Sequence, residues 1–157
     1  MLGNKRQLIN YLMDQDMEKL FDLKEHREKR SMTQNAYYWV LLTKLADALR
    51  ESKTVIHNRL LRRYGCLETI DGCAVRALIP DTEEAEGKIL AMDTSHWKPT
   101  AQVKVMGDGI TYRTYVLLKG SSDMDSREMS ILLDGLIDEA KQCHIETLPP
   151  HELEALK

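Results

Sequence analysis

Apolar residues recur at regular intervals from the start of the chain. Five apolar residues stand at helical spacing and predict a first helix over about residues 5–17. They are Leu8, Ile9, Leu12, Met13 and Leu20. Apolar and polar residues then alternate over residues 20–26, a pattern that indicates a short strand.

A second helix is predicted to begin at Ser31. Ser31 and Gln34 form an S-x-x-Q capping box, in which each side chain accepts a hydrogen bond from the other residue's backbone amide. At about 100° per residue, one face of this helix is apolar and predicts core residues. Tyr37 lies on the other face and is the one aromatic residue here placed as an exposed stacking platform. The apolar face consists of Tyr38, Trp39, Leu42, Leu45, Ala46 and Leu49.

A third helix follows, so that residues 31–64 form a helix pair. Ser52 is a suitable N-cap, and Gly65 stands where such a helix ends. We expect Val55, Ile56, Leu60 and Leu61 to face inward. Arg59, Arg62 and Arg63 are expected to face outward, where they suit either the helix dipole or a phosphate partner.

Two β-hairpins are predicted within residues 66–118, with Asp-Gly turns at 71–72 and 108–109. A two-residue turn in the second hairpin places Lys104 opposite Arg113 and Gln102 opposite Tyr115. Adjacent like charges are unfavourable unless something anionic lies between them. This surface therefore suits phosphates and bases, or else a covering acidic helix. The segment between the hairpins is expected to be a loop with one helical turn.

The last long helix is predicted over about residues 126–143. Asp125 with Glu128 repeats the capping pattern, and Pro149 and Pro150 then interrupt the chain. We therefore expect an α+β fold: one domain over residues 1–148, in which capped amphipathic helices accompany two hairpins that form a small antiparallel sheet. Residues 149–157 form a tail or short helix. The inward stripe of the last helix is Met129, Leu132, Leu133, Leu136, Ala140 and Cys143.

Composition agrees with a folded domain that does not enter a membrane. The chain has 157 residues, of which 43% are hydrophobic and 30% charged, and no apolar run approaches the roughly 18–20 residues that span a bilayer. No secretory signal is recognisable, and three scattered cysteines suit a reducing cytoplasm. A zinc site of Cys66 and Cys73 with His57 or His96 lacks the usual C-x-x-C spacing.

Charge is distributed unevenly along the chain. Residues 24–63 hold ten Lys and Arg against four Asp and Glu, a local charge of +6. Residues 120–157 hold three against nine, a local charge of −6. Such separation favours one face for an anionic partner and another face for a different partner, although charged runs are also ordinary solvated surface.

No catalytic motif is recognisable in the sequence. The P-loop, G-x-G-x-x-G, G-x-S-x-G and H-E-x-x-H patterns are all missing. Asp123, Asp125 and Glu128 offer oxygen ligands for magnesium, but helix capping explains their spacing better. We therefore expect a binding protein that needs no cofactor.

The segment around the second helix resembles a known family. Its "R-S-M-x-x-N-x-x-x-W" pattern, formed by Arg30, Ser31, Met32, Asn35 and Trp39, is similar to the R-S-L-x-x-N-x-x-x-W segment of the phage NinB (Orf) recombination proteins. Residues 119–147 resemble the Ser-rich turn and long helix of that family. The whole sequence also looks like small proteins encoded in phages and prophages of Gram-positive bacteria.

The resemblance implies a homodimer that binds single-stranded DNA and the host single-strand-binding protein, and that helps to load a phage recombinase. Sequence-independent binding of this kind uses Lys and Arg along the backbone path and planar side chains for stacking. Ser31, Asn35 and Trp39 are assigned structural roles. The candidate DNA-binding residues are Lys24, Arg27, Lys29, Arg30, Tyr37, Lys104, Arg113 and Tyr115.

Two other functions remain open at this point. A magnesium-dependent phage nuclease or junction resolvase would bring together at least two carboxylates from Asp71, Asp108, Asp123 and Asp125. A protein adaptor would instead bind its partner through the acidic C-terminal half and would show no salt-sensitive DNA binding.

Overall fold

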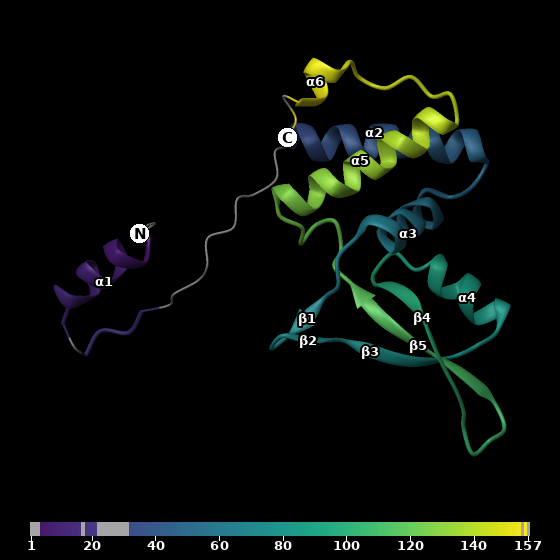
Figure 1. Cartoon of the computed structure of the whole chain (residues 1–157), viewed down its shortest axis with the longest axis horizontal. Helices are drawn as coiled ribbons and strands as arrows, with labels where there is room; N and C mark the ends of the chain where they lie inside the picture. Colours follow the sequence, from purple (N-terminus) through teal and green to yellow (C-terminus); the bar gives the residue numbers. More distant parts are fainter. Residues whose placement is uncertain (1–3, 17, 22–31, 155, 157) are drawn as a thin grey trace.

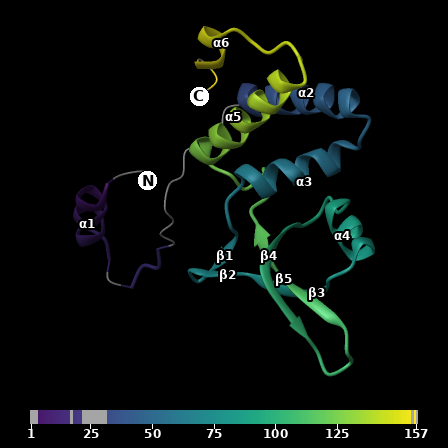
Figure 2. The ribbon, with the colours of Figure 1, turned by 45° about the vertical axis from the view of Figure 1, so that its right-hand side comes forward.

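The predicted α+β class is confirmed. The computed structural model describes residues 4–16, 18–21, 32–154 and 156. In Figures 1 and 2, helices α2, α3 and α5 gather at one end, and a three-stranded sheet with helix α4 forms the other end. Helix α1 lies apart from both groups in these views. Where the structure describes the chain, no helix is both long and apolar enough to cross a membrane.

Three helices enclose the main hydrophobic core. They are α2 (Met32–Leu49), α3 (Lys53–Tyr64) and α5 (Ser126–Gln142). The caps predicted for α3 and α5 are present, since the Ser52 side chain accepts from the Val55 amide and Asp125 forms a reciprocal box with Glu128. The expected inward residues of α5 are buried, apart from the partly buried Cys143 at its end. On α3, Ile56, Leu60 and Leu61 are buried as expected, while Val55 is half-buried.

The hairpins form two small sheets. The first hairpin pairs β1 (Thr69–Ile70) with β2 (Cys73–Ala74). Asp71 and Gly72 both have positive φ there, as a two-residue type I′ turn requires. The larger sheet has the order β3-β5-β4 and is antiparallel throughout, with strands β3 (Arg76–Pro80), β4 (His96–Val105) and β5 (Thr111–Leu118).

The register predicted for the second hairpin is wrong by one residue. Lys104 pairs with Tyr112, and Arg113 pairs with Val103. The reason is a three-residue loop: the Gly109 amide donates to the Met106 carbonyl, and Gly109 has a φ of 77°. A bulge between Pro99 and Val103 then shifts the pairing again.

The segment between the hairpins is also more ordered than predicted. It contains helix α4 (Glu83–Leu90), and β4 begins at His96 within the expected loop. The Thr82 side chain caps α4 by accepting from the Ala85 amide, and three glutamates in the first turn favour the positive end of the helix dipole.

The two ends of the chain differ from their predictions in detail. Helix α1 covers Lys5–Met13, shorter than residues 5–17, and begins with a capping box of Asn4 and Gln7. Leu20 and Phe21 are not in a strand, and the rest of the predicted strand lies outside the described residues. The short C-terminal helix expected after Pro149 is present as α6 (Pro150–Glu154).

Gly135 is required where α5 crosses the end of α3. A Cβ at this position would overlap the ring of Tyr64, whereas a Cβ at Gly87 in α4 would meet nothing within 4 Å. We expect Gly135→Ala to lower the free energy of unfolding by about 1–2 kcal/mol, because overpacking exceeds the gain in helix propensity. Gly87→Ala should raise it by about 0.5–1 kcal/mol. Urea denaturation of both variants tests this pair, and an equal effect of the two would contradict it.

Candidate functional site

The side of the sheet facing away from α4, here called the outer face, carries basic residues at both margins. Directly paired residues share a face, so Val116 of β5 lies between Arg76 of β3 and Lys98 of β4. Two pairs further along, Tyr112 lies between Pro80 and Lys104. The basic side chains are exposed, and the central ones are half-buried. The outer face consists of Arg76, Leu78, Pro80, Lys98, Lys104, Tyr112, Thr114 and Val116.

The three strands contribute no Asp or Glu to the outer face over the pairs described here. One carboxylate approaches from the adjoining loop, where Asp108 accepts a 3.2 Å hydrogen bond from the Tyr112 hydroxyl. That hydrogen bond raises the pKa of Tyr112. The face therefore combines a positive margin on each side with an apolar and aromatic centre.

Arg113 and Tyr115 point to the opposite side, toward α4. Arg113 donates to both carboxylate oxygens of Asp81, at 2.8 and 2.9 Å, and this pairing lowers the pKa of Asp81. Tyr115 is 2% exposed, and its hydroxyl donates to Glu86 at 2.5 Å. The expectation that both residues join Lys104 on one DNA-binding surface is thus wrong in its geometry. The alternative of a covering acidic helix describes their positions correctly.

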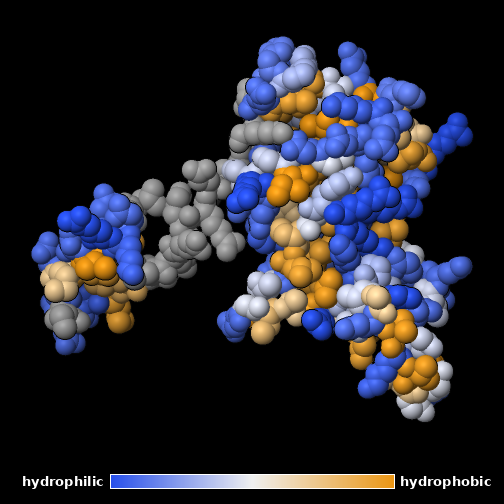
Figure 3. Space-filling view, in the orientation of Figure 1, coloured by the Kyte–Doolittle hydropathy of each residue, from blue (hydrophilic) through white to orange (hydrophobic). Residues whose placement is uncertain are grey.

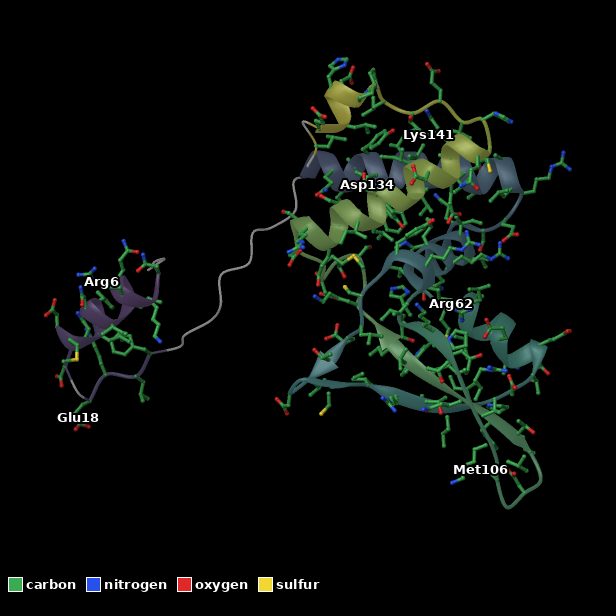
Figure 4. The ribbon with its side chains drawn as sticks, in the orientation of Figure 1. Arg6, Glu18, Arg62, Met106, Asp134 and Lys141 are labelled. Carbon is green, nitrogen blue, oxygen red and sulfur yellow. The ribbon has the colours of Figure 1, made fainter. Side chains whose placement is uncertain are left out.

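Arg62 is likewise turned inward, against expectation. Figure 4 shows it extending from α3 toward α4 and the sheet. Its guanidinium pairs with Glu86 and donates to the Trp97 carbonyl at 2.7 Å. Burial alone would raise the pKa of Glu86, but the hydrogen bonds from Tyr115 and Arg62 outweigh it and lower that pKa. Arg62 thus joins α3, α4 and β4, while Arg59 and Arg63 pair with Glu51 and Glu139 nearer the surface.

Tyr37 and Trp39 exchange the positions predicted for them. The chain after α5 returns over α2, so Tyr37 packs against the core and its hydroxyl accepts from the Leu148 amide at 3.0 Å. Trp39 is 39% exposed, whereas Tyr38 is fully buried. Tyr37 is therefore not an exposed stacking platform, and the aromatic residue that can serve as one is Trp39.

Trp39 forms one wall of a pocket of about 250 Å³. The pocket lies where α2 and α3 meet the start of β4 and the turn after β5. The Trp39 ring is tilted by 38° over His57, with ring centroids 5.0 Å apart. The pocket is lined by Trp39, Thr54, His57, Asp93, His96, Ser121 and Ser122.

Asn58 determines the hydrogen-bonding state of His96. The Asn58 amide nitrogen donates to the carbonyls of Leu90 and Met92, at 2.8 and 2.7 Å. Its oxygen is left to accept from Nδ1 of His96, 2.6 Å away. Burial lowers the pKa of His96, against the opposing charges of Asp123 and Asp93. A neutral His96 that donates through Nδ1 keeps Nε2 as an acceptor.

His57 is the more deeply buried of the two histidines. It is 6% exposed, and its Nδ1 lies 2.7 Å from the Tyr38 hydroxyl. Burial and then the neighbouring His96 lower the pKa of His57 to about 4. Burial also raises the pKa of Tyr38, so this hydroxyl stays protonated. Both pocket histidines are neutral at physiological pH.

These histidines make stability depend on pH. The folded pKa of His57 lies below the unfolded value, so the unfolded chain binds more protons as the pH falls below about 6.5. We expect the free energy of unfolding to fall by roughly 1.5 kcal/mol between pH 6.5 and 5. Carboxylates whose pKa is lowered in the folded protein lose their contribution to the free energy of unfolding only at still lower pH. In urea titrations, His57→Gln should make the free energy of unfolding less dependent on pH between 6.5 and 5, whereas His151→Gln, at an exposed position, should not. An unchanged pH dependence in His57→Gln would contradict the conclusion that His57 is its source.

Most of the remaining residues predicted for the site are not among the described residues. Lys24, Arg27, Lys29, Arg30 and Ser31 are outside the described residues. Asn35 is half-buried, and its side-chain oxygen is buried without a hydrogen-bond partner in the described structure.

The four carboxylates of the nuclease alternative do not all lie in one place, although Asp123 and Asp125 are only two residues apart. Asp71 and Asp108 occupy the turns of the two hairpins, which lie at different ends of the sheets in Figures 1 and 2. Asp125 caps α5. Over the described ranges, no group of three or more His, Cys, Asp or Glu side chains is placed to hold a metal ion, and this includes the cysteines of the zinc alternative.

A separate apolar feature lies at the tip of the β4–β5 hairpin. Figure 3 shows hydrophobic side chains gathered there, and Met106 is labelled at the tip in Figure 4. Val103, Val105 and Ile110 are each about half exposed.

Comparison with known proteins gives no relative for this chain. No family model, no curated protein and no solved structure matches it. The functional argument therefore depends on the residues described above.

Proposed function

We propose that this protein binds single-stranded DNA along the outer face of its three-stranded sheet. The observation that carries this proposal is the arrangement of Arg76, Lys98 and Lys104 at the margins of a face whose centre is apolar and aromatic. Cations attract the phosphates regardless of sequence, and planar or apolar groups between them accept bases.

The dimensions of the face support a single strand. Neighbouring strands lie about 4.8 Å apart, so the β3 and β4 margins are separated by roughly 10 Å. Val116 and Tyr112 are four residues apart on β5, which is roughly 13 Å along the strand. A face of this width, with basic residues at both margins, suits one backbone with its bases directed to the centre.

The biological role follows from the resemblance noted in the sequence. Arg30, Ser31, Met32, Asn35 and Trp39 match the NinB-like pattern, and the basic segment at residues 24–30 precedes α2. The proposed role is that of a phage or prophage recombination accessory protein without catalysis. It would act as a homodimer in the cytoplasm of the bacterial host, together with the host single-strand-binding protein and a phage recombinase.

The test is anisotropy of fluorescent oligonucleotides, single-stranded and duplex, over a salt series with and without magnesium. We expect tighter binding of the single strand, a steep loss of affinity with salt, and no cleavage. Magnesium-dependent cutting would favour the nuclease alternative. No binding at low salt would overturn the proposal and favour a protein adaptor.

A further inference from the structure

The pocket beside Trp39 has a lining that is unsuited to phosphate. Its seven lining residues include no Lys or Arg, and Asp93 adds a negative charge. Its acceptors are Nε2 of the half-buried His96 and the carboxylate of the exposed Asp93, and its permanent donor is the indole N–H of Trp39. Three hydroxyls, from Thr54, Ser121 and Ser122, can donate or accept. A ligand that matches this lining is uncharged, planar and rich in hydrogen-bond donors.

The pocket adjoins the outer face at the start of β4. His96 and Lys98 are two residues apart on the same strand, so they lie on the same side of it and roughly 7 Å apart. This spacing is close to one nucleotide step along an extended backbone. A phosphate held by Lys98 therefore places the neighbouring base within reach of the pocket.

We propose that the pocket holds one unstacked base of the bound strand and prefers cytosine and adenine, whose exocyclic amino group occupies the position where thymine and guanine carry a carbonyl oxygen. This inference rests on the proposed single-stranded DNA binding and adds a base preference to it. The base lies against the exposed indole of Trp39 and donates its amino hydrogens to His96 Nε2 and Asp93. Thymine has a carbonyl oxygen in place of this amino group, and that oxygen would face these acceptors.

The hydrogen bonds of Asn58 explain why the pocket can discriminate between bases. Asn58 is 3% exposed and is fixed by three hydrogen bonds, so His96 cannot turn its N–H group toward the ligand. His96 is half-buried, so its Nε2 is left without a protein partner when the base offers no donor, and sites built to bond a polar group reject analogues that lack it.

The test compares short oligodeoxycytidine with oligodeoxythymidine of equal length, which have bases of similar size. We expect oligodeoxycytidine to bind about tenfold more tightly, as one charge-assisted hydrogen bond allows. Oligomers of 2-pyrimidinone deoxyribonucleoside, which lack only the amino group, should bind like oligodeoxythymidine. Trp39→Leu should weaken binding of every oligomer, and Asp93→Asn should reduce the preference to about threefold or less. Asp47→Asn, an exposed position on α2, serves as the charge-matched control and should retain the preference.

The outcomes separate this inference from the function it rests on. Equal binding of both pyrimidine oligomers, or a preference unaffected by Asp93→Asn, would overturn the base preference while leaving the sheet-face proposal standing. No binding of any oligomer by the wild-type protein would overturn both. Thermal unfolding of each variant verifies that a changed affinity does not reflect loss of the fold.

Discussion

Simultaneous replacement of Arg76, Lys98 and Lys104 by Gln is expected to lower the affinity for single-stranded DNA about a hundredfold at about 0.1 M salt. Each lost phosphate contact removes roughly 0.7 from the slope of the logarithm of affinity against the logarithm of salt concentration. Three contacts therefore reduce the slope by about 2. Anisotropy titrations over a salt series measure both quantities.

The control for this variant removes the same charge elsewhere. Lys5, Lys44 and Lys141 are exposed and lie on α1, α2 and α5, away from the sheet. Their joint replacement by Gln should change the affinity by less than about threefold, since only long-range attraction is altered. If both triple variants lose affinity equally, net charge rather than the outer face determines binding.

Replacement of Asn58 is expected to have the largest effect on stability among the site residues. Asn58→Ala leaves the Leu90 and Met92 carbonyls and the His96 N–H without their partner, around a side chain that is 3% exposed. We expect the free energy of unfolding to fall by about 2–4 kcal/mol. Urea denaturation at pH 7 measures this loss.

The isosteric variant Asn58→Asp separates hydrogen bonding from packing. It retains the shape of the side chain but loses both donors, and it brings a charge toward two carbonyl oxygens. It should destabilise at least as much as Asn58→Ala, because the carboxylate faces the two carbonyl oxygens. A loss below about 0.5 kcal/mol in both variants would show that this network does not position His96.

Local signals were sufficient to predict most helices. Ser52, and the pair of Asp125 and Glu128, stand at the starts of α3 and α5 because capping depends on residues only three positions apart. The first hairpin was predicted equally well from Asp71 and Gly72. Helix α4 carried the same kind of signal in Thr82 and its glutamates, which the sequence interpretation overlooked.

Features that depend on distant partners could not be predicted in this way. Two glycines flank Asp108, so the sequence is compatible with a two-residue and with a three-residue loop. The prediction assumed the two-residue loop and therefore placed Arg113 on the same face as Lys104, whereas the three-residue loop in the structure places it on the other face. Asp81 and Glu86, which hold Arg113 and Tyr115, belong to a segment that was expected to be a loop.

The dependence on distant partners also explains why the predicted exposures of Tyr37 and Trp39 are exchanged in the structure. Tyr37 lies at one edge of the apolar face of α2 and Trp39 at the other, and periodicity alone treats the two edges alike. The returning C-terminal segment covers the Tyr37 edge, while the pocket leaves the Trp39 edge open. The pocket itself joins residues from four parts of the chain, so no local pattern in the sequence predicts it.

The measurement that tests DNA binding by the outer face most directly is a map of amide chemical shifts during titration with oligodeoxycytidine. We expect the largest changes in β3, β4 and β5 at Arg76, Lys98 and Tyr112, and further changes at Ser121 and Ser122 beside the pocket. Little change is expected in α4, on the opposite side of the sheet. Changes confined to α4, or to α2 and α5 away from the pocket, would contradict the proposal.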